Sequence, residues 1–357
     1  MNRIKRNTIG MFDCLKGVIV LSVILFHSYM DVWSAGRYEA APLLYRLITT
    51  FPAPAIGTLF LVSGYGFSPI RKRRSFRNQV KLLLRPCVIV YICAIAVRIP
   101  LNLINGQNPL EGAGKRILGL LLGSLSYKSI FGVEVYSILV FWYMIALFLA
   151  WLLLSLIFKI FKKTVARTCA VCLCVSVGAL LSLWGRTIPF CIVPTLLAIG
   201  FLYFGYVMKK QNWLFVKLSW WIYLILAVVS LLILKFGEMN LGTGVMKLGL
   251  INYAGMICVC FLVLRIYLCL FCSDWKIYTP FMFLGRNSLL ILCLHGFEHL
   301  VFEWSNYAFL TRLAPQVTAW CLAVVRAVIV VGLFYLIQLL QKIYKKMKKN
   351  NMIREEK

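Results

Sequence analysis

The stretch from residue 11 to residue 30 reads MFDCLKGVIVLSVILFHSYM and decides what kind of fold the chain adopts. It matches the roughly 20 apolar residues that cross the ~30 Å hydrocarbon layer of a bilayer as a helix. Lys16 and His27 interrupt it, and ionisable groups inside a span are costly and usually functional. A secretory signal peptide needs only an apolar middle. We therefore interpret this stretch as a membrane helix that carries function.

Similar apolar runs recur along the whole chain. Of the 357 residues, 62% are hydrophobic and only 14% are charged, whereas about a quarter are charged in ordinary soluble domains. The fold class we predict is an all-α polytopic membrane protein, with one membrane-embedded domain over 1–345 and a basic tail over 346–357. Ten transmembrane helices are expected, at about 11–30, 48–68, 82–100, 137–158, 168–184, 189–208, 218–235, 249–270, 280–302 and 318–341.

Lysine and arginine gather in the short segments between these runs and give the chain a net charge of +28. If the N-terminus is cytoplasmic, 25 of the 39 Lys and Arg residues fall on inner segments and ten on outer ones. The positive-inside rule then places both termini in the cytoplasm. The same pattern explains the positive charge without a nucleic-acid partner, so the expected partner is the lipid bilayer. No oligomeric state is indicated.

Lys16 and His27 lie eleven residues apart. At about 100° per residue their side chains share one face of a helix, roughly 16 Å apart. Asp13, three residues before Lys16, is placed to form an ion pair with it. Each residue also has a plainer interpretation, because a lysine can extend to the membrane edge and a histidine can bond a neighbouring helix. Their combination favours a functional role.

A second polar stripe lies on the ninth predicted span, where Ser288, His295 and His299 fall at i, i+7 and i+11. The stripe lines a pocket or makes polar contacts between helices. A metal pair at His295 and His299 would lack an acidic or cysteine ligand at matching spacing, so we expect no metal. Glu134 and Glu298 are the acidic candidates for orienting the His27 ring.

Four motifs follow one another over residues 12 to about 296. They are Asp13-x-x-Lys16-Gly17 with His27 after ten intervening residues, LFLVSGY at 59–65, FWY at 141–143, and LGRNSL at 284–289 running on to His295. In this order they resemble the motifs of acyltransferase family 3, the bacterial membrane acyltransferases that modify surface polysaccharides. One departure concerns Arg77, Lys81 and Arg85, whose spacing of four differs from the family's Arg-x-x-Arg pair and leaves open which residue corresponds.

The resemblance implies a membrane O-acyltransferase of the bacterial cytoplasmic (inner) membrane. It would move an acyl group, expected to be acetyl, from cytoplasmic acetyl-CoA or another acyl-CoA to a hydroxyl of an extracytoplasmic sugar or glycan. His27 suits the general base, with Lys16 as the second catalytic residue. The residues expected to bind or surround the donor are Arg77, Lys81, Arg85, Ser63 and Tyr65, and those expected at the acceptor are His295, Ser288 and Trp142.

Two other functions remain open at this point. A transporter or flippase for a glycolipid or polysaccharide intermediate would use Lys16, His27 and His295 to line a permeation route. We find no internal repeat of the kind from which many transporters are built. The other is a membrane-embedded interaction or sensing subunit without turnover.

Overall fold

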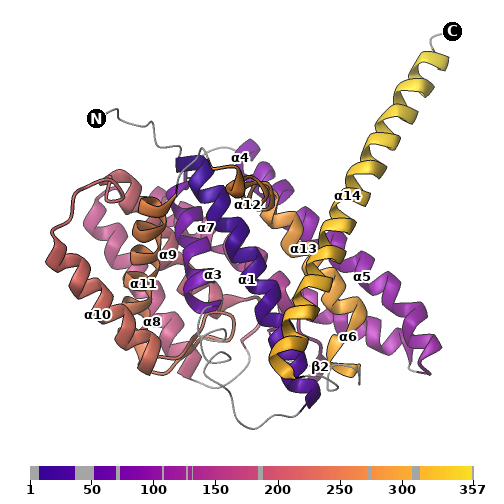
Figure 1. Ribbon diagram of the computed structural model, residues 1–357, viewed down its shortest axis with the longest axis horizontal. Coiled ribbons are helices and arrows are strands. Elements are labelled where there is room, and N and C mark those ends of the chain that lie inside the picture. The colour runs from indigo at the N-terminus through magenta and orange to yellow at the C-terminus, as the bar shows by residue number, and fades with distance from the viewer. Residues whose placement is uncertain are drawn as a thin grey trace.

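The computed structural model describes residues 8–36, 52–69, 73–106, 108–125, 128–130, 132–183, 188–271, 275–307 and 314–355, most of them in helices (Figure 1). The α-helices are α1 (Thr8–Gly36), α3 (Pro52–Tyr65), α4 (Arg73–Gln79), α5 (Arg85–Ile104), α6 (Pro109–Leu122), α7 (Trp142–Ile160), α8 (Thr164–Leu183), α9 (Ile192–Lys210), α10 (Trp220–Phe236), α11 (Gly249–Leu270), α12 (Thr279–Arg286), α13 (Ser288–Phe302) and α14 (Pro315–Glu355). A π-helical turn, Val80–Leu84, joins α4 to α5, and 3-10 turns lie at Leu139–Phe141, Lys276–Tyr278 and Trp304–Asn306.

Two short antiparallel hairpins are the only strands in these described ranges. The first pairs β1 (Lys128–Ile130) with β2 (Val133–Val135), and Lys128 lies opposite Val135. The second pairs β3 (Met239–Asn240) with β4 (Val245–Met246), and Met239 lies opposite Met246. Both hairpins belong to connections between helices, so the fold class is all-α as predicted.

Within the described residues, seven or eight helices can span a membrane, so the expected count of ten is not confirmed. An eighth candidate is the pair Lys276–Arg286 and Ser288–Asn306, which is bent by 71°. Helix α3, with 14 residues, and α10, with 17, are short for a span, and 48–51 lies outside the described residues. Seven described helices are long and apolar enough: Gly10–Gly36, Ser75–Ile104, Leu139–Ile160, Thr164–Leu183, Ile192–Lys210, Gly249–Leu270 and Pro315–Met347.

Figure 1 shows α1, α3 and α7 in the middle of the bundle, α8 to α11 on one side, and α5, α6, α13 and α14 on the other. Packing contacts agree with this arrangement, since α3 and α7 pack on α9, and α13 packs on α5 and α14. Helix α14 continues through residue 345 to Glu355 and projects well beyond the bundle (Figure 1). Residues 346–355 are therefore a continuation of a helix.

The crossing of α1 and α12 depends on two glycines of the sequence motifs. A Cβ atom on Gly285 would lie 1.6 Å from the Asp13 carbonyl oxygen, and one on Gly17 would lie 2.0 Å from the Phe281 carbonyl oxygen. Only glycine lets the two backbones approach so closely. This crossing fixes the end of α12 beside the first turns of α1.

Helix α12 ends where an asparagine side chain competes for a helical carbonyl. The Asn287 amide donates to the Phe283 carbonyl at 2.9 Å, and local bonds of this kind offer the backbone an alternative to a continuous helix. Helix α13 begins at the next residue, Ser288, in a new direction. The break therefore places the start of α13 near Lys16 and its later turns near His27.

Candidate active site

Three cavities lie in a row along the bundle, and neighbouring cavities share lining residues. The Lys16 cavity, of about 300 Å³, and the His27 cavity, of about 280 Å³, are both lined by Tyr143 and Leu292. The His27 cavity and the largest one, the Arg98 cavity of about 590 Å³, are both lined by Leu139. The row therefore runs from the Lys16 end of α1 to the connections that follow α5 and α13.

The Lys16 cavity has two cations at one carboxylate. Lys16 Nζ lies 2.8 Å from Asp13 Oδ1, which confirms the predicted pair. Arg286 Nε lies 3.3 Å from the other oxygen, Asp13 Oδ2. Ser63 and Ser288 also line this cavity, so Ser288, expected at the acceptor, lies with the residues expected at the donor. One positive charge is in excess here.

The basic residues predicted to hold the donor are placed differently. Arg77, Lys81 and Arg85 are all exposed, and none of them lines the Lys16 cavity. The same segment supplies Gln79 together with Leu82 and Leu83. The helical segment thus turns its uncharged face to the cavity and its cations outward.

Tyr65, the other residue expected to surround the donor, lies outside the Lys16 cavity. Its ring packs against Phe12 with centroids 5.0 Å apart, and it does not line any of the three cavities. It ends α3 directly after Gly64, where a Cβ atom would lie 2.0 Å from the Leu202 carbonyl oxygen of α9. The motif therefore also makes a close helix crossing, one residue from Ser63.

The His27 cavity is mostly apolar and lies between α1, α7 and the β3–β4 hairpin. Trp142, expected at the acceptor, lines it together with His27 and Asn240. The Tyr143 side chain, on the wall shared with the Lys16 cavity, is hydrogen bonded to Ser63. Residues of the second and third motifs thus meet between the two cavities.

The three histidines of the chain form one cluster. The His27 ring centroid lies 5.3 Å from that of His295 and 5.2 Å from that of His299, and the last two are 6.1 Å apart. His27 lines its own cavity and His299 lines the Arg98 cavity. The cluster therefore lies between the two cavities. Its third member, His295, is fully buried.

A buried network of charges holds this cluster. Glu298 Oε1 lies 2.7 Å from His295 Nδ1 and accepts from Arg326 Nε at 2.7 Å. Glu298 Oε2 accepts from Trp304 Nε1 at 2.6 Å. Arg326 Nη1 donates to Asp31 Oδ2 at 2.7 Å. Arg326 and Glu298 are fully buried, and a buried charge is tolerated only when it is paired and hydrogen bonded.

This geometry gives His295 the form of an oriented base. A carboxylate at Nδ1 favours the tautomer with the proton on that nitrogen, which leaves Nε2 as an acceptor. The Nε2 atom of His295 is buried and has no hydrogen-bond partner in the described structure. The ring can therefore accept a proton at Nε2, while His295 itself lines none of the three cavities.

The sequence placed Glu134 and Glu298 as candidates to orient His27, and the structure assigns them elsewhere. Glu298 bonds His295, and Glu134 lies 2.7 Å from Lys115 Nζ at the surface. Within the described ranges no carboxylate forms a hydrogen bond or ion pair with His27. No group of three or more His, Cys, Asp or Glu side chains there has the spacing to hold a metal ion.

Sequence reasoning missed Asp31, Arg286 and Arg326 as site residues. A usable signal existed for Arg326, which interrupts the last apolar run as Lys16 interrupts the first. The rule that an ionisable residue in a span needs a partner points to Asp31 and Glu298, since these acids also lie in spans.

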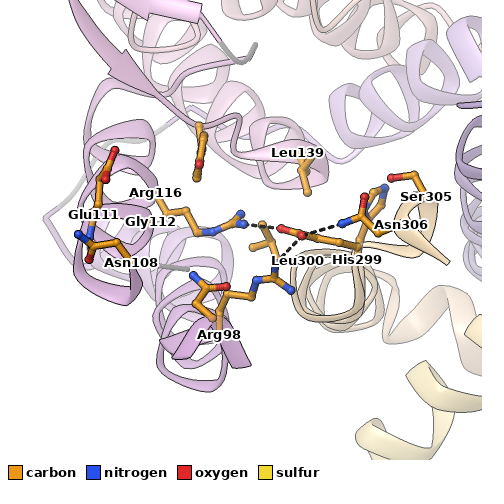
Figure 2. Close-up of a pocket in the computed structure, with 13 residues that line it drawn as sticks. Arg98, Asn108, Glu111, Gly112, Arg116, Leu139, His299, Leu300, Ser305 and Asn306 are labelled. Atoms are coloured by element: carbon orange, nitrogen blue, oxygen red, sulfur yellow. Dashed lines mark hydrogen bonds and ion pairs between the residues drawn. The ribbon is translucent and has the colours of Figure 1, made fainter. Parts of the chain in front are cut away.

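The Arg98 cavity contains an ion-pair cluster from three different elements, as Figure 2 shows. Arg116 of α6 lies 2.7 Å from Glu303 Oε1, and Arg98 of α5 bonds Glu303 Oε2. The Arg98 side chain also donates to the Val301 carbonyl at 3.0 Å. Asn306 donates to Glu303 Oε2 at 3.2 Å. The cluster ties α5 and α6 to the end of α13.

These features define a polytopic helical membrane protein with a histidine and carboxylate site at a row of internal cavities. The family model described as an acyltransferase domain matches residues 9–337. Because the match covers nearly the whole chain, the protein belongs to this family, acyltransferase family 3, and is a membrane acyltransferase. A comparison with curated proteins and one with solved structures found no match.

Proposed function

We propose that the protein transfers an acetyl group from cytoplasmic acetyl-CoA, or another acyl group from its CoA thioester, to a hydroxyl of an extracytoplasmic sugar or glycan in the bacterial cytoplasmic membrane. One observation carries the proposal. The row of three cavities runs from a pair of cations at one end, past a histidine cluster, to a polar cavity at the other. Such a row suits two reactants that arrive from opposite faces.

The donor enters at the Lys16 cavity in this proposal. Acyl-CoA carries phosphates, and the excess positive charge of Lys16 and Arg286 attracts them. Arg77, Lys81 and Arg85, exposed on the segment that also forms one wall of the cavity, hold phosphates that remain outside. The acyl arm then passes Tyr143 into the His27 cavity.

The reaction needs a base because a sugar hydroxyl is a weak nucleophile until its proton is removed. His27, which lines the cavity, accepts that proton, and His295, fixed by Glu298, supports it from behind. The hydroxyl oxygen forms a bond to the thioester carbon, the carbon–sulfur bond breaks, and the CoA thiolate takes the proton from the histidine.

Transfer is direct in this scheme. Ser28, adjacent to His27, is fully buried and donates to the Ile24 carbonyl at 2.8 Å, so it is not available as an acyl carrier. Trp142 offers its ring to the sugar, since aromatic side chains combine apolar area with a polar edge.

The test is acetyl transfer by His27→Ala from radiolabelled acetyl-CoA, measured on purified protein. General-base catalysis contributes about 10²–10⁴-fold, so the rate should fall at least that far while membrane abundance is unchanged. Ser22→Ala is the matched control, because the Ser22 hydroxyl only donates to the Val18 carbonyl of the same helix at 3.0 Å. Activity within a few-fold of the parent in His27→Ala would transfer the role of base to His295.

Release of free CoA distinguishes this proposal from the transport of a glycolipid. An acyltransferase consumes acetyl-CoA in proportion to the acetylated acceptor. Transport of an acceptor analogue into proteoliposomes without CoA release would contradict transfer.

A further inference from the structure

The Arg98 cavity carries more buried positive charge than its carboxylate neutralises. Arg98 is 8% exposed and Arg116 is 5% exposed, yet both guanidinium groups share the single carboxylate of Glu303. An uncompensated buried charge is unfavourable. This excess is the first sign that the cavity receives an anion.

Three buried polar atoms of cavity-lining residues have no hydrogen-bond partner in the described structure. They are the Nε atoms of Arg98 and Arg116 and the Oδ1 atom of Asn102. Buried polar groups are normally paired. Two donors and one acceptor without partners match a ligand that carries both an oxyanion and a hydroxyl.

Acidic residues at the rim do not cancel the excess. Glu111 also lines the cavity, and it belongs to α6. Its side chain is 57% exposed and pairs with Lys115 at 2.7 Å. Lys115 pairs equally closely with Glu134. One lysine between two glutamates leaves one negative charge in excess, but Glu111 and Glu134 are both exposed. Solvent therefore screens their charges from the buried arginines.

The position of Glu303 is built into the backbone. This residue has a φ of +46°, a conformation that costs a non-glycine residue free energy and that the surrounding contacts must stabilise. The left-handed turn ends α13 and carries the carboxylate between the two arginines. The Arg116 guanidinium also lies 4.9 Å from the centre of the Tyr136 ring, which holds it in place.

From these contacts we infer that the Arg98 cavity binds the acceptor through an oxyanion, so that the acceptor is an acidic sugar: a uronic acid or a sugar phosphate. The inference rests on the proposed acyl transfer for its biological meaning. His299 lines the same cavity and its ring lies 5.2 Å from that of His27. The anion held by Arg98 and Arg116 thus leaves a hydroxyl of the same sugar near the histidine cluster.

Binding by the purified full-length protein tests this without any reaction. Methyl glucuronide, glucose 1-phosphate and neutral methyl glucoside are each titrated by calorimetry in detergent. A hydrogen-bonded charge pair should lower the Kd of at least one anionic sugar roughly tenfold or more below that of methyl glucoside. Which anion binds identifies the carboxylate or the phosphate. Equal Kd values for all three sugars would overturn the inference.

Variants of Arg98 and Arg116 test whether these residues cause the preference for an anionic sugar. Arg98→Gln and Arg116→Gln should each abolish it, and Arg98→Lys, which keeps the charge beside Glu303, should retain part of it. Lys162→Gln, at an exposed position outside the cavity lining, is the matched control and should leave the preference unchanged. A preference that survives both glutamine variants would place the anion elsewhere and refute the site.

Transfer kinetics separate the two proposals. If acetyl reaches methyl glucoside with the same KM as methyl glucuronide and glucose 1-phosphate, acyl transfer stands and the oxyanion site is refuted. If an anionic sugar binds preferentially through Arg98 and Arg116 but no acetyl-CoA is consumed, the oxyanion site stands and the proposed function is refuted.

Discussion

Replacing Arg326 with glutamine removes the cation that separates two buried carboxylates. Arg326 donates to Asp31 and to Glu298, both at 2.7 Å. A hydrogen bond to a charged group contributes about 1.5–3 kcal/mol, and breaking a buried ion pair costs about 3–5 kcal/mol. We expect Arg326→Gln to lower the free energy of unfolding by about 3–5 kcal/mol, which raises the unfolded-to-folded ratio about 10²–10⁴-fold.

The unfolding can be followed by circular dichroism while dodecyl maltoside micelles are titrated with sodium dodecyl sulfate. The triple variant Asp31→Asn, Glu298→Gln, Arg326→Gln should recover more than half of the loss, because no buried carboxylate then lacks a counter-charge. Acetyl transfer should stay low in the triple variant, since His295 no longer has its carboxylate.

Arg265→Gln is the matched control for this experiment. Arg265 is equally a buried arginine in a helix, but it bonds the carbonyls of Trp213 and Leu214 and the Tyr223 hydroxyl. Adding Asp31→Asn and Glu298→Gln should not restore the stability lost in Arg265→Gln. The reasoning is refuted if Arg326→Gln unfolds within about 0.5 kcal/mol of the parent, or if the two added neutral substitutions destabilise it further.

Two more substitutions test the α1–α12 crossing and the donor site. Gly285→Ala should lower the free energy of unfolding by about 2 kcal/mol or more in the same titration, because its Cβ would lie 1.6 Å from the Asp13 carbonyl oxygen. Gly332→Ala is the control, because its Cβ would have no atom within 4 Å. Equal effects of the two variants would contradict the close crossing. Arg286→Gln should raise the KM for acetyl-CoA more than that for the acceptor, and more than Arg77→Gln does, because Arg286 lines the Lys16 cavity and Arg77 does not. Equal KM values in the two variants would show that the cavity does not select the donor phosphates.

Local periodicity predicted the parts of the site that lie on one helix. The spacing of Asp13 and Lys16 gave their ion pair, and the single stripe of His295 and His299 appears on α13. Both follow from about 100° of turn per residue. The apolar runs also predicted the helical class. Hydropathy does not show where a helix breaks, so the bend at Asn287 and the shortness of α3 and α10 were not foreseen.

The Arg98 cavity could not be predicted because its parts are far apart in the chain. Glu303 follows Arg98 by 205 residues and Arg116 by 187. Only the packing of α13 on α5 brings them together. Charge counting likewise found the basic segment around Lys81 but could not tell which face of it meets the Lys16 cavity.

The three cavities are neighbours and not one open channel. Tyr143 and Leu292 line both cavities at one junction, and Leu139 lines both at the other. Leu139 has a φ of +49° and its N–H donates to the Ser137 hydroxyl at 3.1 Å, so the backbone fixes the position of this shared wall residue. An unbroken polar pore would let protons run down the membrane potential, a gradient of about 2.3 kcal/mol per charge for each 100 mV. Side chains between the cavities therefore suit the proposed transfer, because reactants from opposite faces would meet without a continuous pore that drains the energy stored across the membrane.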